Sequence, residues 1–254
     1  MFGKVMPLKS EYTPGDSRLT NTTGRSYSWR LDQFKNLGGK ENIAAALGVL
    51  HRLSADRWHT FVAELLASKL AMDAPFWELC CALNLVALEC RPSTYLEIGV
   101  RKGKSMAQVA TQVPDCHIVG FDAWISPYAD VETPGPDYVA AEMHRLGHRG
   151  KLELISGSSH DTVPQFLDAN PSLYFDLITV DGDHSETGAM NDLRNVTPRL
   201  APGGTLIFDD LTNPNCPLGA VWERYKEEYG SILVFQENLA DHQGTGIAIR
   251  ASKT

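Results

Sequence analysis

Two short apolar runs in the second half of the chain each end in acids. Leu177–Val180 leads into Asp181-Gly182-Asp183-His184, and Thr205–Phe208 leads into Asp209-Asp210. If these runs are neighbouring strands of a parallel sheet, their carboxyl ends meet at one edge and bring the acids together. Like charges held that close cost energy unless a cation neutralises them, and a hard divalent ion prefers oxygen ligands. Asp181, Asp209 and Asp210 therefore predict a divalent-metal site.

The same acids could instead cap the segments that follow them. Asp183 and Ser185 could cap a helix beginning near Glu186, and Asp210 could cap a turn before Pro214. A lone aspartate favours capping, whereas three acids at two converging strand ends favour the metal.

A glycine turn follows an earlier apolar run, in the segment Tyr95-Leu96-Glu97-Ile98-Gly99-Val100-Arg101-Lys102-Gly103-Lys104-Ser105. Glycines let a backbone approach a ligand closely, and the start of the next helix offers free N–H groups. A P-loop needs four residues between its glycines, one more than Gly99 and Gly103 have, and Arg101 breaks the dinucleotide pattern. S-adenosylmethionine (SAM) fits better, because the Glu97 carboxylate would repel a triphosphate and attract an ammonium or sulfonium group.

Two further strand ends could face a nucleoside. Asp122, in Gly120-Phe121-Asp122-Ala123-Trp124, lies about 20 residues after the glycine turn, the spacing of an acid that accepts hydrogen bonds from ribose hydroxyls. Trp124 could stack near the adenine or only pack in the core. Gly157 and Ser158 follow the next apolar run, where Gly-Ser is also an ordinary turn.

These strand ends can meet only if the chain from Thr94 onward forms one sheet. Apolar runs alternate there with helical stretches such as Ser105–Gln112 and Glu186–Leu200. The runs are Tyr95–Ile98, His117–Phe121, Leu152–Ile155, Leu177–Val180, Thr205–Phe208, Ile232–Phe235 and Gly246–Ile249. The alternation predicts an α/β fold, a doubly wound, mostly parallel seven-stranded Rossmann-like sheet covered on both faces.

The first third of the chain has a different character. Residues 1–30 are rich in Ser, Thr, Gly and Pro and are expected to form a flexible arm, either disordered, folded over the site or in contact with another subunit. Residues 31–92 predict a helical extension, with its clearest helix after Asp73-Ala74-Pro75. Residues 93–254 are then the ligand-binding core. Within it, residues 125–150 are longer than a usual connection and predict either part of an acceptor pocket or a surface loop with one helix.

The pattern Glu97-x-Gly99-x-x-x-Gly103-x-Ser105 resembles the first motif of class I SAM-dependent methyltransferases. Asp181-Gly182-Asp183-His184 with the paired aspartates resembles the metal-dependent sugar and natural-product O-methyltransferases of the methyltransferase-24-like group, over about Thr94 to Arg250. The resemblance implies Mg²⁺ at Asp181, Asp209 and Asp210. It also implies SAM binding by Glu97, Gly99, Gly103, Ser105, Asp122, Ala123, Gly157, Ser158 and Asp181.

The resemblance further implies a general base. In some relatives it is a His three residues after the first metal ligand, which matches His184, and in others an Asp two residues after it, which matches Asp183. The metal would hold an acceptor hydroxyl, the base would remove its proton, and the oxygen would attack the SAM methyl group. Three alternatives stay open: a metal-independent methyltransferase with His184 as base, a P-loop-like nucleotide-binding protein, and a SAM-binding protein without catalysis.

The amino-acid composition indicates which classes of binding partner and which cellular location to expect. A net charge of −8 argues against nucleic acid, because phosphate contacts need surplus Lys and Arg. The five cysteines, Cys80, Cys81, Cys90, Cys116 and Cys216, form no CxxC pair, so neither a disulfide framework nor a zinc site is expected. With no signal-peptide pattern and no apolar run of about 18 residues, a cytoplasmic protein without membrane contact is expected. A small-molecule hydroxyl acceptor and a homo-oligomer, dimer or larger, are the expected partners.

Overall fold

The computed structural model describes residues 36–54, 56–128, 131–239 and 243–250, together with the backbone of two short strands. These are β1 (Leu19–Thr20) and β2 (Ser26–Tyr27), which pair antiparallel. The expectation of a flexible arm over residues 1–30 otherwise falls outside the described residues.

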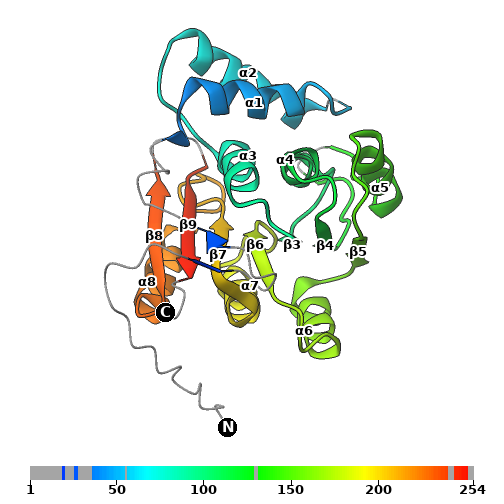
Figure 1. The fold of residues 1–254 in the computed structure, drawn as a ribbon, viewed down its shortest axis with the longest axis vertical. Coiled ribbons are helices and arrows are strands. Elements are labelled where there is room, and N and C mark those ends of the chain that lie inside the picture. The colour runs from blue at the N-terminus through cyan, green and yellow to red at the C-terminus, as the bar shows by residue number, and fades with distance from the viewer. Residues whose placement is uncertain are drawn as a thin grey trace.

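All seven predicted strands are present and form one sheet, in the order β5-β4-β3-β6-β7-β9-β8 (Figure 1). Their bounds are β3 (Thr94–Ile98), β4 (His117–Asp122), β5 (Leu152–Ser156), β6 (Phe175–Val180), β7 (Leu200–Phe208), β8 (Leu233–Asn238) and β9 (Thr245–Arg250). The strands from β5 to β7 are parallel, and β9 runs antiparallel to both β7 and β8. The predicted mostly parallel Rossmann-like sheet is confirmed.

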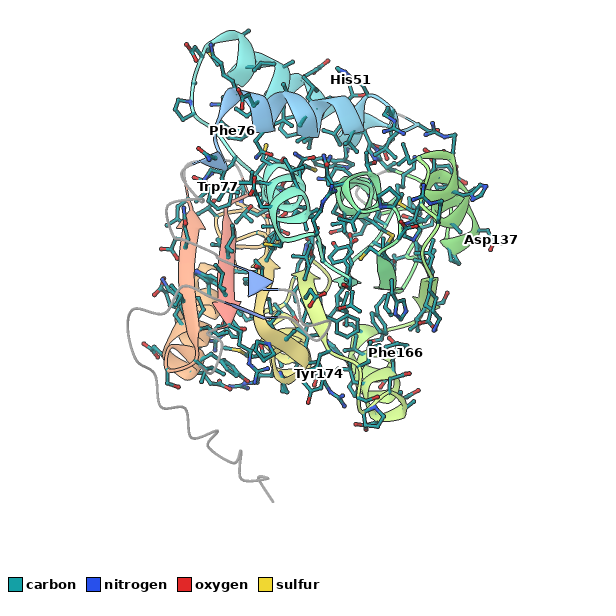
Figure 2. The ribbon with its side chains drawn as sticks, viewed as in Figure 1. His51, Phe76, Trp77, Asp137, Phe166 and Tyr174 are labelled. Atoms are coloured by element: carbon teal, nitrogen blue, oxygen red, sulfur yellow. The ribbon has the colours of Figure 1, made fainter. Side chains whose placement is uncertain are left out.

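Helices cover both faces of this sheet (Figure 1). One face carries α3 (Leu79–Cys90), α4 (Lys104–Gln112) and α5 (Pro136–Arg145), and the other carries α6 (Ser159–Ala169), α7 (Glu186–Val196) and α8 (Gly219–Tyr229). Because helices cover both faces, the inner strands β3, β4, β6 and β7 are buried at nearly every position rather than at alternate ones. On the second face, Phe166 of α6 packs edge-on against Phe121 of β4, with ring centroids 5.5 Å apart (Figure 2).

The N-terminal helical extension is also confirmed. α1 (Lys40–Leu50) and α2 (Arg57–Ala71) form an outer layer above α3 and α4 (Figure 1). The buried Asn42 amide joins α1 to α3, because it donates to the Cys81 carbonyl at 2.9 Å and its oxygen accepts from Asn84 at 2.9 Å. No helix within the described ranges is both long and apolar enough to cross a bilayer.

The predicted start of the helix after Asp73-Ala74-Pro75 is wrong, because α3 begins at Leu79. The Phe76 N–H donates to the Gly38 carbonyl at 3.3 Å instead of entering a helix, and the Glu78 carboxylate accepts from the Cys81 N–H at 3.0 Å. Glu78 is therefore the N-cap of α3. The sequence prediction placed the helix start earlier because Pro75 is a typical residue of a first helical turn. The helix predicted to run from Glu186 to Leu200 ends at Val196 and continues as a 3-10 turn over Thr197–Arg199.

Candidate active site

The acids predicted at two strand ends lie side by side. β6 and β7 are parallel neighbours, and Val180 pairs with Phe208, so Asp181 and Asp209 each follow a paired residue. The Asp209 N–H donates to the Val180 carbonyl at 3.2 Å. The two strand ends therefore converge as the sequence predicted.

Burial makes this acid cluster electrostatically costly. Asp209 and Asp210 are each 2% exposed. Burial raises the pKa of both carboxyl groups, and the charge of Asp181 raises each pKa further. The hydroxyl of Thr245, on β9, donates to Asp209 Oδ1 at 2.9 Å and offsets only part of this cost.

A positive charge reaches the cluster from Lys104, the first residue of α4. Burial lowers the pKa of the Lys104 ammonium group, but the surrounding Cys80, Glu78, Asp209 and Asp181 outweigh burial and shift that pKa upward. Lys104 is therefore charged at neutral pH, and it lowers the pKa of Asp209 in return.

His184 lies among the carboxylates of both strand ends. Its Nε2 is 3.5 Å from Asp181 Oδ1 and 3.2 Å from Asp210 Oδ2. The hydrogen bond with Asp181, and the negative charges of Asp181 and Asp210, raise the pKa of His184 to about 9 against the opposing effect of burial. The sequence placed this pKa near neutrality, whereas these neighbours hold the imidazole protonated at pH 7 as long as nothing else neutralises them.

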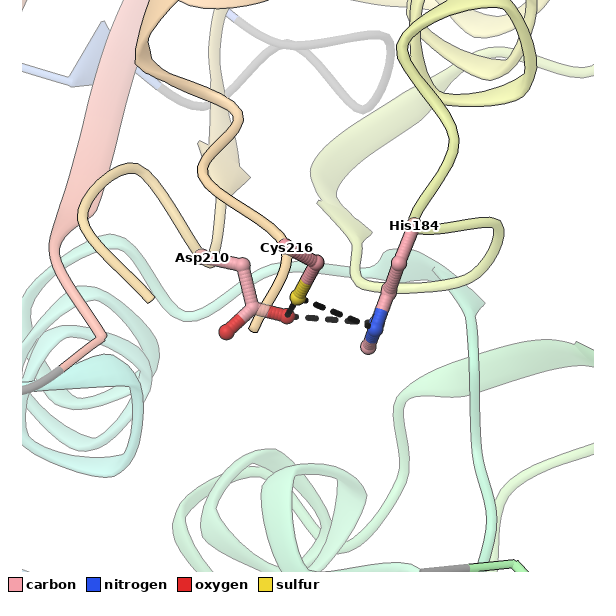
Figure 3. A group of neighbouring side chains, drawn as sticks. All are labelled: His184, Asp210 and Cys216. Carbon is pink, nitrogen blue, oxygen red and sulfur yellow. Dashed lines mark hydrogen bonds and ion pairs between the residues drawn. The ribbon is translucent and has the colours of Figure 1, made fainter. Parts of the chain in front are cut away.

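The other side of the His184 ring meets a thiol. Cys216 Sγ is 3.4 Å from His184 Nδ1 and 3.7 Å from Asp210 Oδ2 (Figure 3). Across the described part of the chain, His184, Asp210 and Cys216 are the one set of three potential metal ligands whose atoms all lie within 4.8 Å of one another. Of the three aspartates predicted as metal ligands, only Asp210 belongs to this set.

The chemistry of the predicted acid site still suits a divalent cation. Asp181, Asp209 and Asp210 offer hard oxygen donors from adjacent strand ends. Burial, and after it the charge of Asp181, raises the pKa of Asp209 and Asp210, so a cation that bound these carboxylates would be stabilised by their negative charge. The residue types therefore suit the predicted metal, whereas the three aspartates as placed here do not form a set of three ligands within 4.8 Å of one another.

The turn from Gly99 to Gly103 needs a glycine at the point where it approaches the acid cluster. Gly99 has a φ of +90°, and a Cβ built there would lie 1.8 Å from the carbonyl oxygen of Asp181. Gly103, with a φ of +77°, precedes α4 and packs against Val139 and Met143 of α5. A residue with a side chain at position 99 would force the glycine turn away from the Asp181 backbone.

Glu97 is completely buried behind the glycine turn. Its Oε2 accepts from the Tyr95 hydroxyl at 3.0 Å, and its Oε1 accepts from the Ser105 hydroxyl. Burial raises the pKa of Glu97 to about 8, although both hydroxyl donors act to lower that pKa. Ser105, predicted to bind the cofactor directly, contacts Glu97 in this structure.

Asp122 ends β4 beside the same turn. Its Oδ2 accepts from the Arg101 N–H and its Oδ1 from the Trp124 N–H, each at 2.6 Å. Trp124 packs against the buried core, and its indole N–H donates to the Ser156 hydroxyl at 2.9 Å. Ala123 is exposed at this edge.

Gly157 and Ser158 lie at the end of β5, next to Asp122. The Gly157 N–H donates to the Asp122 carbonyl at 2.9 Å, and Ser158 precedes α6 as its N-cap residue. The predicted cofactor residues of β3, β4 and β5 therefore share the carboxyl edge of the sheet.

Asp183 points to partners other than the acid cluster. Its Oδ1 accepts from the Ser185 N–H at 2.8 Å, and its Oδ2 is 3.0 Å from His160 Nε2. Ser185 is the N-cap of α7 and accepts from the Gly188 N–H at 3.0 Å. The capping interpretation is thus confirmed for Ser185, and Asp183 organises the same turn, while His184 faces the cluster.

The long segment 125–150 also reaches the site. It consists of a connection, described except for residues 129 and 130, and helix α5. The hydroxyl of Tyr128 is 3.3 Å from His184 Nδ1, and the guanidinium of Arg101 lies 5.8 Å from the centre of the Tyr128 ring. Tyr128 therefore joins this segment to both the candidate base and the glycine turn.

Sequence reasoning missed three side chains of the site. Lys104 follows the second turn glycine and was weighed only as part of a P-loop pattern. Thr245 and Cys216 come from segments without a motif, and only the pairing of β7 with β9 and the fold of the loop after β7 bring them to the acids.

Residues 96–211 match a family model described as a methyltransferase domain, Methyltransf_24. A comparison with curated protein sequences finds no match.

Solved structures share the fold. The O-methyltransferase TomG from Streptomyces achromogenes, involved in tomaymycin synthesis and solved with SAM, is 17% identical with a TM-score of 0.55, over 84% of this chain and 90% of that one. CalS11, a TDP-rhamnose 3'-O-methyltransferase of calicheamicin biosynthesis, is 22% identical with a TM-score of 0.51, over 83% and 93%. An O-methyltransferase from Bacillus cereus, solved with S-adenosylhomocysteine, is 17% identical with a TM-score of 0.53, over 78% and 92%.

Proposed function

We propose that the chain is a class I SAM-dependent methyltransferase that methylates a hydroxyl oxygen of a small molecule with the help of a divalent cation. The match of residues 96–211 to a methyltransferase-domain family model supports this proposal. One observation carries this proposal. Gly99 of the glycine turn lies against the backbone of Asp181, whose carboxylate faces His184. A methyl donor held by the glycine turn would therefore lie beside the acids and the candidate base.

The acceptor proton would pass to His184. The imidazole is protonated at neutral pH while Asp181 and Asp210 are uncompensated, since their charges raise its pKa to about 9. A divalent cation, when bound, would supply positive charge against these carboxylates and against the charge developing on the acceptor oxygen. With the carboxylates compensated, the pKa of His184 returns toward neutrality and the ring can accept a proton.

Asp209 and Asp210 would hold the cation together with Asp181, and Mg²⁺ is the expected ion. Thr245 would orient Asp209 through its hydrogen bond to Oδ1. Asn213 and Gln243 would orient Asp210, since both donate to its Oδ1, at 2.8 and 3.3 Å.

We further propose that the acceptor is a sugar or a natural-product hydroxyl and that segment 125–150 helps to select it. The motifs at the two strand ends support this acceptor class, and the contact between Tyr128 and His184 supports the role of the segment. TomG and CalS11, which share the fold, act in antibiotic biosynthesis according to their descriptions.

A metal-independent enzyme is a second candidate, and the charge of Lys104 favours it. Lys104 already lowers the pKa of Asp209, and protonated His184 already pairs with Asp181 and Asp210. Undiminished turnover in the presence of a chelator would support this candidate over the metal-assisted one.

The test is calorimetric titration of the purified protein with S-adenosylhomocysteine, with and without Mg²⁺, and with ATP as the control. Micromolar binding of S-adenosylhomocysteine, with no binding of ATP, supports the proposal. Binding of ATP alone would mean that the glycine turn recognises phosphate and that the acids serve a nucleotide-bound metal.

A further inference from the structure

The loop between β7 and α8 holds a thiol against the candidate base. Cys216 is partly exposed in this loop, whereas the other four cysteines are buried. Its N–H donates to the Asn213 carbonyl at 3.2 Å, and the Asn213 side chain donates to Asp210 Oδ1 at 2.8 Å. The Leu218 N–H closes the loop onto the Asp210 carbonyl at 3.0 Å. These bonds fix Cys216 next to Asp210.

The loop and its neighbours also fix the orientation of the Asp210 carboxylate, so that one of its oxygens faces His184 and Cys216. Its backbone has a φ of +65°, a left-handed conformation that a non-glycine residue rarely adopts. Its Oδ1 is occupied by Asn213 and Gln243, which leaves Oδ2 facing His184 and Cys216. A strained residue held by surrounding bonds is typical of a functional site.

The two separations that involve Cys216 suit a tetrahedral metal centre. Zinc bonds of about 2.3 Å to sulfur and 2.0–2.1 Å to nitrogen, at a tetrahedral angle, put the two ligand atoms about 3.6 Å apart. Cys216 Sγ and His184 Nδ1 are 3.4 Å apart. The same construction gives about 3.5 Å between sulfur and a carboxylate oxygen, and Cys216 Sγ is 3.7 Å from Asp210 Oδ2.

We propose that His184, Cys216 and Asp210 form a binding site for a thiophilic divalent ion of the zinc class, with a ligand set that shares only Asp210 with the three-aspartate site. The three side chains supply three protein ligands and leave a fourth position for water, as in open zinc sites. When sulfur and Nδ1 bind the ion, the thiol proton and the Nδ1 proton of the imidazolium leave to solvent. Nε2 keeps its proton and donates to a carboxylate, for which Asp181 Oδ1 lies 3.5 Å away.

This site would compete with methyl transfer, a consequence that rests on the proposed function. Asp210 belongs to both ligand sets, and an ion on His184 removes the candidate base. Mg²⁺ has little affinity for a thiol, while zinc-class ions bind imidazole and thiolate well. The two ion classes would thus occupy mutually exclusive states of one site.

The experiment uses Co²⁺ as a spectroscopic probe of the full-length, metal-free protein. We expect a near-ultraviolet thiolate-to-Co²⁺ charge-transfer band and the intense visible bands of a four-coordinate ion, both lost in Cys216→Ser. Cys116→Ala is the matched control, because Cys116 is buried far along the chain from these ligands, and it should keep the spectrum.

Zinc affinity, measured by competition with a chromophoric chelator, should fall about 100-fold or more in Cys216→Ser, since loss of an outer-sphere partner alone costs 10- to 100-fold. A wild-type spectrum without the charge-transfer band, or one unchanged in Cys216→Ser, would overturn the proposal. S-adenosylhomocysteine binding, measured on the same samples, tests the methyltransferase function separately, because that ligand does not report on Cys216.

Discussion

Glu97 should ionise when the amino group of the cofactor binds. The pKa of this buried carboxyl group is about 8, because burial raises it more than the Tyr95 and Ser105 hydroxyls lower it. At pH 7 the group is then about nine-tenths protonated. If its role is to pair with the ammonium group of SAM, binding at pH 7 should release about 0.9 proton, and affinity should rise about fivefold between pH 7 and pH 8.

The same shift predicts a change in stability. The folded pKa of Glu97 lies above its unfolded value of 4.5, so only the unfolded state ionises between these pKa values. The free energy of unfolding of the ligand-free protein should therefore decrease as pH rises from about 4.5 to 8, by about 3 kcal/mol at pH 7 as an upper bound. Glu97→Gln removes this dependence, so the variant should be more stable than wild type at pH 7 and similar to it near pH 4.5.

The assay is calorimetric titration with S-adenosylhomocysteine in buffers of different ionisation enthalpy, combined with chemical unfolding at several pH values. Glu153→Gln is the control, since Glu153 lies on β5 and pairs with His117 and Lys151 rather than facing the glycine turn. Proton uptake or release near zero, or a Glu97→Gln variant that binds at pH 7 as tightly as wild type, would refute the reasoning.

Three further predictions concern the other parts of the site. Asp181→Ala should abolish turnover and a chelator should have the same effect, while S-adenosylhomocysteine affinity distinguishes loss of chemistry from loss of cofactor binding. Gly99→Ala should lower the free energy of unfolding by more than about 2 kcal/mol, given its φ of +90° and a Cβ 1.8 Å from a carbonyl oxygen. Gly48→Ala, in α1 with no atom within 4 Å, is the control and should stabilise by up to about 1 kcal/mol. Exchange of segment 125–150 with that of a relative should change acceptor preference, and Tyr128→Phe should change the pH dependence of turnover; unaltered selectivity in the exchange would argue for a plain surface loop.

The strands could be predicted because a strand that is buried on both faces has a short run of mostly apolar residues, which is visible in the sequence. Runs such as Leu177–Val180 are apolar except at Thr179, and a parallel strand in a covered sheet favours such a nearly continuous pattern. Once β6 and β7 were expected to be neighbours, the convergence of Asp181 and Asp209 followed from their places at the strand ends. The importance of Gly99 could also be predicted, since only glycine fits where the turn meets Asp181.

The parts that could not be predicted depend on contacts between distant segments. Glu78 caps α3 because Phe76 is held by Gly38, which no local pattern at Pro75 records. Cys216 stands in a stretch without a motif, and cysteine spacing alone argued against a zinc site. Only the folded loop after β7 brings that thiol within 3.4 Å of His184.

Asp181 contacts both the glycine turn and His184, and it uses different atoms for each contact. Its backbone carbonyl lies against Gly99 and so determines how closely the glycine turn approaches the sheet, while its carboxylate is the largest influence on the pKa of His184. The position of a methyl donor held by the turn would therefore depend on the fold of the strand end, and the proton affinity of His184 depends on what neutralises the Asp181 carboxylate. Under the two proposals, a bound cation, Mg²⁺ on oxygen or a thiophilic ion through Cys216, would change the protonation of the candidate base without moving the turn that would hold the methyl donor.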